Sequence, residues 1–329
     1  MSGQTAQDAA SRAILRAVMF MVGSAAMFAC MAAVIRLASS QLHPFEIAFF
    51  RNLFGMVFAL PLLFRHGWGL LRTDKLHLYA TRCVIGMVGM LCGFSAIVYL
   101  PLAQAVTLSY STPLFVTIGA VLVLGEVVRA RRWTAVAIGF LGVLLIVRPG
   151  TQGFSAMSLV AVVAAVLSAA VAISIKVLSR TEKPDAIVLY TTLFWVPMSL
   201  VPALLVWVWP TGWTWLWIVA AGFFGTMGHM FWTRALKLGD ASLLTPISFV
   251  QVPIVAFIGW ALFDETVGLW TGLGAGVIFA SNAYIAHREA QLARRTTTDP
   301  AMPPPAAGAA AEQSPLAPAD ARNGGRPAG

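Results

Sequence analysis

The sequence predicts an all-α membrane protein whose ten transmembrane helices form two inverted five-helix repeats. The first observation behind this prediction is the composition: 59% of the 329 residues are hydrophobic and only 11% are charged. A soluble domain carries about 25% charged residues, so this chain needs a bilayer to cover its apolar surface. Helices are the expected form, because lipid offers no partners to backbone N–H and C=O groups.

The second observation is an internal repeat. The run STPLFVTIGAVLVLGE at residues 111–126 returns, altered, as QVPIVAFIGWALFDE at 251–265, with a proline near each start and a glutamate at each end. A second pair, RLASSQLHP at 36–44 and KVLSRTEKP at 176–184, keeps the same order along the chain. Repeats of this kind are typical of secondary transporters, so we expect one duplicated bundle.

Taken in order, the chain divides into two tails and two repeats of five apolar runs each. About 20 apolar residues are needed to cross a bilayer as a helix. The expected units are a cytoplasmic tail at residues 1–15, repeats at 16–149 and 150–290, and a disordered cytoplasmic tail at 291–329. The expected spans cover residues 17–34, 45–64, 76–100, 103–124 and 133–147, then 155–178, 186–209, 213–236, 241–263 and 267–285.

Three prolines lie deep enough within the expected spans to interrupt a helix. Pro113 falls in the fourth span, and Pro246 and Pro253 fall in the ninth. A proline removes one internal hydrogen bond and crowds the preceding turn. We therefore expect both of these helices to be kinked, with carbonyl groups left partly unpaired where they face a cavity.

Lysine and arginine set the expected orientation, because loops on the cytoplasmic side carry an excess of positive charge. The even-numbered loops and the C-terminus hold most of the basic residues, whereas the odd-numbered loops offer only Arg148, with Arg36 at a helix end. Both termini are therefore expected in the cytoplasm, and five spans per repeat place the second repeat upside down. The expected location is the inner membrane, crossed many times, with the lipid bilayer as a partner.

The motifs do not favour an enzyme or a nucleic-acid-binding protein. The sequence has no Walker loop, no GxGxxG turn, no HExxH and no GxSxG. Its five histidines and three cysteines make no metal-ligand spacing, and the net charge of +9 comes from short clusters between apolar runs. We expect no catalysis, no cofactor, no metal and no nucleic acid, and transport that needs no ATP hydrolysis by this chain.

Polar groups inside the apolar runs are the candidates for substrate binding, because each must be shielded from lipid. Arg51 lies about 10 Å into the membrane at 1.5 Å per residue from Pro44, where a guanidinium holds an anionic or amide group. The alternatives are that Arg51 snorkels outward or pairs with Glu46. The predicted substrate-binding residues are Arg51, Thr107, Tyr110, Ser111, Trp232, Thr245, Ser248 and Gln251.

Most of those residues follow one face of the fourth and ninth spans, which correspond in the two repeats. That correspondence favours a shared cavity, although serine and threonine also bond to the backbone of their own or neighbouring helices. A lone His229 in the eighth span is more often a packing residue than a ligand.

Carboxylates at helix ends are the candidates for gates. Glu126 and Glu265 each end a helix, where a carboxylate opposes the helix dipole and needs a cation. Basic residues follow Glu126 directly, whereas Arg148 shares the expected membrane side of Glu265. The predicted gating or ion-pair residues are Arg36, Glu46, Glu126 and Glu265, and a simple surface ion pair is the alternative.

Small residues recur at every fourth position of the tenth span, at Gly268, Gly272 and Gly276. Such a stripe lets helix backbones approach closely. We expect it to pack within the monomer or in a homodimer through the tenth span.

Several motifs together resemble the drug/metabolite transporter superfamily, specifically its ten-span EamA-type members. They are HPFEIAFFRN at residues 43–52, YLPLAQA at 99–105, the 111–126 run, GVLLIVRPG at 142–150 and LGDASLLTPI at 238–247. The resemblance implies two inverted five-helix repeats around a central cavity. The first half is similar to bacterial carriers for riboflavin or S-adenosylmethionine uptake. Thr191 replaces Arg51 in the second half, which predicts an electrostatically lopsided cavity.

The expected function is that of a secondary transporter, which moves a small polar or amphipathic metabolite across the inner membrane by alternating access. Riboflavin-like or S-adenosylmethionine-like uptake is one form of this prediction, and export of amino acids, metabolites or drugs is the alternative. A non-transporting membrane scaffold or sensor is the alternative from another class, and it would usually carry a folded soluble domain.

Overall fold

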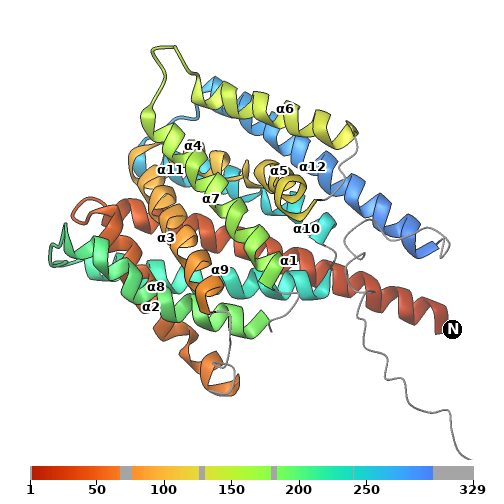
Figure 1. The fold of residues 1–329 in the computed structure, drawn as a ribbon, viewed down its shortest axis with the longest axis horizontal. Helices are drawn as coiled ribbons and strands as arrows, with labels where there is room; N and C mark the ends of the chain where they lie inside the picture. Colours follow the sequence, from red (N-terminus) through yellow and green to blue (C-terminus); the bar gives the residue numbers. More distant parts are fainter. Residues whose placement is uncertain (1, 67–75, 126–129, 179–183, 240, 299–329) are drawn as a thin grey trace, which may run out of the picture.

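The chain folds into an all-helical bundle in the computed structural model, which describes residues 2–66, 76–125, 130–178, 184–239 and 241–298. The first half supplies six helices and the second half six more, with no strand in these ranges (Figure 1). The helices are α1 (Ser2–Ala38), α2 (Pro44–His66), α3 (Leu76–Tyr99), α4 (Leu102–Ser109), α5 (Thr112–Leu124), α6 (Ala130–Val147), α7 (Ala156–Leu178), α8 (Pro184–Leu204), α9 (Thr214–Leu238), α10 (Ala241–Ser248), α11 (Gln251–Phe263) and α12 (Leu269–Thr298).

Six described segments are long and apolar enough to cross a membrane, judged by length and composition. Two of them join a short and a long helix across a break. The segments are Arg12–Ala38, Leu76–Tyr99, Leu102–Leu124, Ala156–Leu178, Leu243–Phe263 and Leu269–Arg288.

The helices at both ends of the bundle extend into the segments expected to be tails. Helix α1 begins at Ser2, so the polar residues before the first apolar run belong to the same helix. Helix α12 continues to Thr298, past the expected start of the tail at 291. The prediction of disorder for the rest of the tail falls on residues 299–329, outside the described residues.

The fourth and ninth expected spans are each divided into two helices by a two-residue link. The short helices α4 and α10 have 8 residues each, and the long helices α5 and α11 have 13 each. Tyr110 and Ser111 join the first pair, and Phe249 and Val250 join the second. Pro113 sits in the first turn of α5, where its missing N–H costs least. The prolines therefore accompany short breaks, at which Tyr110, Ser111 and Val250 keep right-handed backbone angles.

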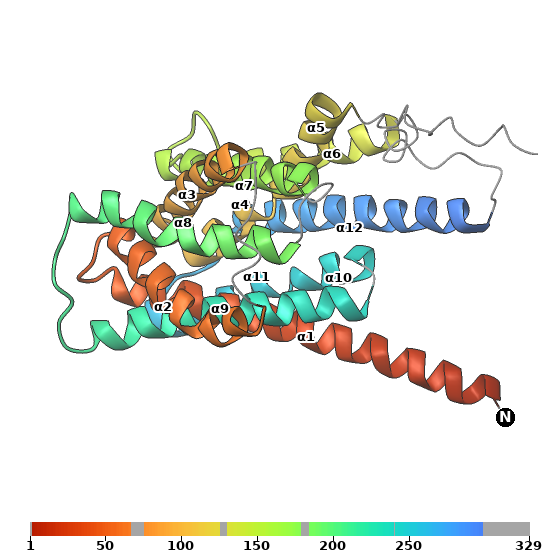
Figure 2. The ribbon, with the colours of Figure 1, turned by 60° about the horizontal axis from the view of Figure 1, so that its bottom comes forward.

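The two halves interleave. Helix α1 packs along α9, and helix α7 packs along α3; the same exchange relates the α2–α9 contact to the α8–α3 contact. Figure 2 shows α1 beside α9, with α1 extending beyond the other helices at its N-terminal end. Because α1 corresponds to α7 and α3 to α9, every one of these contacts joins one half to the other.

Helices α6 and α12 form a layer at one edge of the bundle (Figure 1). A methyl group at Gly142 would lie 2.9 Å from the carbonyl oxygen of Gly274, so glycine permits this close approach. The predicted stripe of Gly268, Gly272 and Gly276 does not pack against α6, because no described atom outside their own helix backbone lies within 4 Å of a methyl group placed at any of the three.

Candidate functional site

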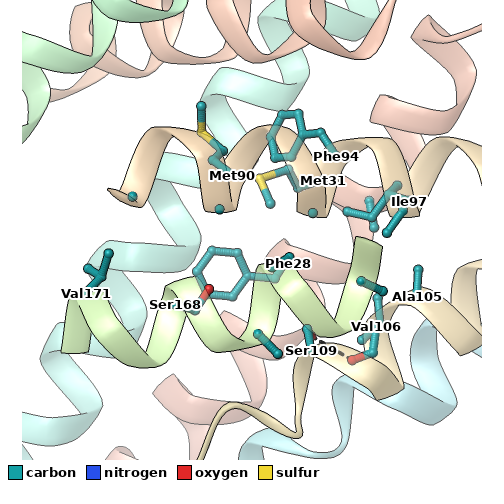
Figure 3. Close-up of a pocket in the computed structure, with 18 of the residues that line it drawn as sticks. Phe28, Met31, Met90, Phe94, Ile97, Ala105, Val106, Ser109, Ser168 and Val171 are labelled. Carbon is teal, nitrogen blue, oxygen red and sulfur yellow. Dashed lines mark hydrogen bonds between the residues drawn. The ribbon is translucent and has the colours of Figure 1, made fainter. Parts of the chain in front are cut away.

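A cavity of about 460 Å³ lies where the two halves interleave. Its volume is within the range of small-molecule sites, which is roughly 300–1,000 Å³. Figure 3 shows it between α3 and α7, with Ser168 and Val171 toward one end and Ile97 toward the other. Helices α1, α4, α8, α9 and α11 complete the wall. From Gly86 to Ile97 along α3 the cavity extends about 16 Å at 1.5 Å per residue.

Glycines shape the α3 side of this cavity. Gly86, Gly89 and Gly93 all line it. A methyl group at Gly86 would lie 3.0 Å from the ring of Trp195, and one at Gly89 would lie 3.0 Å from Leu167. These glycines therefore allow α3 to lie close to α7 and α8 and also leave room for the cavity.

Aromatic rings and thioethers face one another across the cavity. Phe28 and Met31 come from α1, Met90 and Phe94 from α3, and Trp195 from α8. Such side chains offer flat apolar surface and soft, adaptable contacts. The arrangement suits a flat ring more than a small inorganic ion.

The polar groups on the wall are few. Ser109 donates its hydroxyl to the carbonyl oxygen of Val106 at 2.7 Å, and Phe28 meets the ring of His229 edge-on at 5.0 Å between centroids. His229 therefore belongs to the cavity, although a packing role was the more ordinary expectation. The polar side chains that line the cavity are Ser109, Ser168, Trp195, His229 and Gln251.

The two helix breaks meet beside the cavity. The ring of Tyr110 lies 4.6 Å from that of Phe249, and its hydroxyl donates to the carbonyl oxygen of Ser248 at 2.6 Å. The same hydroxyl lies 3.1 Å from Oε1 of Gln251, which it orients at the cavity wall. The amide of Asn282 donates to the carbonyl oxygen of Tyr110 at 2.8 Å, so this exposed backbone group at the break is satisfied.

An ion pair lies at the Ile97 end of the cavity. Nη2 of Arg36 is 2.5 Å from Oε1 of Glu265, and Nη1 donates to the carbonyl oxygens of Ile97 and Leu100 at 2.6 Å each. Oε2 of Glu265 accepts the N–H of Leu102 at 2.7 Å. Arginine thus caps the negative end of α3, and glutamate caps the positive start of α4.

The end of α11 allows Glu265 to reach this position. Asp264 adopts a left-handed φ of 54°, and the N–H of Glu265 then donates to the carbonyl oxygen of Gly259 at 3.0 Å. A methyl group at Gly259 would lie 3.1 Å from Oε2 of Glu265, so glycine leaves space for the carboxylate. Arg148, which was expected on the same membrane side as Glu265, does not pair with that carboxylate. Its guanidinium lies over the ring of Trp270 at 5.4 Å.

The other predicted gating residues behave differently. Glu46 is buried in the first turn of α2 and accepts the N–H groups of His43 at 3.1 Å and Val208 at 2.7 Å. It is therefore a helix cap and does not form an ion pair with Arg51. Glu126 lies outside the described residues.

Arg51 lies between α2 and α9, behind the cavity wall. Its Nη1 donates to Oδ1 of Asn52 at 3.1 Å, and its buried Nε has no partner. A methyl group at Gly225 would lie 2.9 Å from the guanidinium and 3.1 Å from the sulfur of Met31. Met31 lines the cavity and Arg51 does not.

Three predicted hydroxyl groups bond to their own helices. Thr107, Ser111 and Ser248 are buried and lie outside the cavity lining. They donate to the carbonyl oxygens of Ala103, Leu108 and Thr245 at 2.6, 2.6 and 2.7 Å. This is the backbone-bonded alternative that the sequence left open.

Trp232 and Thr245 also lie away from the cavity lining. Trp232 packs in a separate cluster with Ala17, Met21, Ala235 and Leu244. Thr245 is partly buried on α10. Of the eight predicted binding residues, Gln251 lines the cavity, and Tyr110 positions the Gln251 side chain. A role for the other six in substrate binding stays a prediction.

The comparison with known proteins follows the two halves of this fold. Residues 15–148 and 155–286 each match the EamA-like transporter family, the first covering α1 to α6 and the second most of α7 to α12. The chain belongs to the EamA-like transporter family. This membership makes it a membrane transporter and supports the expectation that it is not an enzyme.

Several relatives of this EamA-like transporter have named substrates. A riboflavin transporter of Vibrio cholerae is 31% identical over 286 residues, which is 85% of this chain and 96% of that one. An S-adenosylmethionine uptake transporter of Rickettsia felis is 28% identical, over 76% of this chain and 85% of that one. A pseudopaline exporter of Pseudomonas aeruginosa is 30% identical, over 76% and 89%.

A solved crystal structure shares the fold. It covers 85% of this chain and 98% of its own, with a TM-score of 0.57 at 21% sequence identity.

Two residues at the Gly86 end of the cavity escaped the sequence analysis. Arg82 is buried on α3 and donates through Nη1 to Oγ1 of Thr191 on α8. Trp195 lies one turn beyond Thr191 and lines the cavity. A charge inside an apolar run was the available signal for Arg82, and a tryptophan far from the ends of its run was the signal for Trp195.

Proposed function

We propose that this EamA-like transporter moves a small amphipathic metabolite, a flat ring system with polar substituents, across the inner membrane by alternating access. The observation that carries the proposal is the cavity at the junction of the two halves, walled by rings and thioethers and holding a few polar groups. Riboflavin and S-adenosylmethionine, named for two relatives, are both flat heteroaromatic rings joined to a polar chain.

The proposed architecture has ten spans, because each broken pair of helices crosses the membrane once. Helices α4 and α5 then form the fourth span, and α10 and α11 the ninth. With both termini in the cytoplasm, as the loop charges predict, the Ile97 end of the cavity faces the periplasm. Reporter fusions after Arg132 and Lys183 should read cytoplasmic and one at Thr211 periplasmic; a cytoplasmic reading at Thr211 would contradict the ten-span count.

In this topology the Arg36–Glu265 network is the proposed periplasmic gate. It ties α1 and the end of α11 to the junction of α3 and α4, directly beside Ile97 of the cavity. Access from the periplasm requires these contacts to separate. The structure supports a periplasmic side closed by four charged or polar contacts.

We also propose that Arg51 contributes to substrate binding, although its side chain does not line the cavity. Its guanidinium lies on Gly225, one turn from His229 on the same face of α9. If the Met31 side chain moved aside, the guanidinium of Arg51 would be exposed to the cavity. It could then donate hydrogen bonds to an acceptor on the substrate.

Export is the second candidate, because one relative at 30% identity is named an exporter. The same cavity serves either direction, since alternating access is reversible and the gradient sets the flux. A homodimer through α12 also stays a proposal, and the outward position of Gly268, Gly272 and Gly276 is compatible with it.

Transport by the purified protein tests the proposal. Liposomes carrying only this protein are loaded with buffer, riboflavin is added outside, and flavin fluorescence inside is followed after gel filtration. We expect uptake on the riboflavin gradient alone. Rates equal to those of protein-free liposomes, for riboflavin and for S-adenosylmethionine, would contradict the proposed substrate class.

A further inference from the structure

Arg82 is a buried cation that pairs with no carboxylate among the described residues. It lies one turn before Gly86 on α3, and its side chain is only 7% exposed. Its Nη1 donates to the neutral hydroxyl of Thr191, and its Nε is buried with no hydrogen-bond partner. No described carboxylate forms an ion pair with it. A charge inside a membrane protein is costly unless it is paired, so this guanidinium needs an anionic partner.

A second unused donor lies beside it. Trp195 follows Thr191 by one turn on α8, as Gly86 follows Arg82 on α3. A methyl group at Gly86 would lie 3.0 Å from Cζ2 of Trp195 and 3.7 Å from Cε2, the carbon that carries the indole nitrogen. That nitrogen is buried and has no partner. Buried indole N–H groups usually find an acceptor, so this one marks a place where an acceptor is absent.

The two donors adjoin the cavity at its Gly86 end. Gly86 and Trp195 both line the cavity, and Arg82 lies directly beneath them on the facing turns of α3 and α8. A guanidinium presents its N–H groups as a fork that matches the two oxygens of a carboxylate or phosphate. An indole N–H adds one further bond to such an oxygen.

We propose that the Gly86 end of the cavity binds an anionic group of the substrate, a carboxylate or a phosphate, through Arg82 and the indole N–H of Trp195. The inference rests on the proposed transport of a ring-bearing metabolite, and it assigns a binding site to a second, anionic part of that substrate. The ring lies against Phe28, Met31 and Met90, and the anionic group reaches toward α8. S-adenosylmethionine carries such a carboxylate, and riboflavin gains such a group as its 5′-phosphate.

Riboflavin and its 5′-phosphate are a matched pair of probes, because they differ only in the anionic group. Binding of each to the full chain, purified in a neutral detergent, is measured by quenching of flavin fluorescence. We expect the phosphate to bind roughly 10-fold more tightly than riboflavin, since hydrogen bonds to charged groups contribute more than neutral ones. Arg82→Gln should remove this preference, and Trp195→Phe, which keeps the ring, should reduce it several-fold.

Arg234→Gln is the matched control. Arg234 is an exposed cation near the C-terminal end of α9, where its guanidinium lies over the ring of Phe20 of α1. The substitution should leave the preference intact. Size-exclusion profiles establish that each variant is folded, and Arg82→Lys supplies a variant that keeps the charge but loses the fork.

A free anion separates failure of this site from failure of the proposed substrate class. Sodium phosphate should raise the melting temperature of the wild type over chloride at equal ionic strength, and the shift should vanish in Arg82→Gln. Equal affinities for the two flavins, or a preference that survives in Arg82→Gln, would overturn the site. If neither flavin binds, the substrate class is wrong, and the absence of an Arg82-dependent phosphate shift would overturn the site as well. Competition by phosphatidylglycerol would assign the donors to a lipid phosphate and also overturn the proposal.

Discussion

An arginine lies just outside each end of the cavity lining, but only one of these arginines is fully paired. At the Ile97 end, Arg36 meets a carboxylate and two carbonyl oxygens, and its partner Glu265 caps the next helix. At the Gly86 end, Arg82 meets one neutral hydroxyl and keeps an unused N–H. The first end is completed by the protein itself, whereas the second is left for a ligand to complete.

The repeat makes a second comparison possible, between the α2–α9 and α8–α3 contacts. Arg51 on α2 lies against Gly225 of α9. The equivalent position on α8 is Thr191, and there the arginine comes from α3 as Arg82. Each contact therefore holds one arginine, half-buried in the case of Arg51 and buried in the case of Arg82, and the two come from opposite sides. The sequence analysis considered Arg51 alone, and Arg82 is a second cation within the apolar helices.

The largest effect is expected from filling the Gly86 side of the cavity. Ser168→Trp places an indole among the lining residues of α7 and should abolish transport, because the substrate and the new ring compete for one volume. Val166→Trp is the matched control, since Val166 lies on the same helix, is 41% exposed and does not line the cavity. Riboflavin uptake into liposomes measures both variants; equal loss in the two would show that the cavity is not the route.

The next effect concerns the paired end. Glu265→Gln leaves Arg36 without its counter-charge and should lower stability by roughly 3 kcal/mol, the lower part of the range for breaking a buried pair. The side chains are 22% and 16% exposed, which favours this lower figure. Melting temperature in detergent measures it.

The double variant Arg36→Gln with Glu265→Gln should be more stable than either single variant, because no charge is left unpaired. Arg148→Gln serves as the control for removing a cation from the same expected side without touching the pair. Additive losses in the double variant would contradict the ion-pair account.

A smaller effect is expected at Gln251. Gln251→Leu removes one neutral hydrogen-bonding group from the cavity wall, which is worth about 0.5–1.5 kcal/mol, or roughly 2- to 10-fold in apparent affinity. Thr112→Val is the control, because Thr112 begins α5 as Gln251 begins α11 but bonds to Ser109 and does not line the cavity. Unchanged affinity in Gln251→Leu at normal protein level would remove Gln251 from the site.

The family, the helical architecture and the helix breaks could be predicted from local sequence. Apolar runs and the repeat are periodic signals, and Pro113 and Pro246 mark both broken spans. The cavity residue Gln251 was found because a polar group in an apolar run must be shielded. These features depend on the chain near each residue.

The partners of these residues could not be predicted in the same way. Arg36 and Glu265 are separated by 229 positions, so only the fold reveals that they meet. The approach of Gly142 to Gly274 likewise joins the two halves. Thr107 and Ser111 carry the right chemistry for a binding site, but their χ1 rotation turns each hydroxyl to its own helix. Helical spacing places a residue on a face without fixing where its polar atom points.

Occupancy of the cavity between α3 and α7 by substrate can be tested directly with a single cysteine. Ser168→Cys, in a chain whose Cys30, Cys83 and Cys92 are replaced by alanine, gives a single thiol at the cavity wall. Its rate of alkylation by a small membrane-permeant reagent is measured with and without saturating riboflavin 5′-phosphate, with Val166→Cys as the control. We expect the flavin to slow alkylation of the cysteine at 168 by roughly 10-fold or more, as occupancy requires, and to leave the cysteine at 166 unchanged; equal rates at 168 with and without bound flavin would contradict the account.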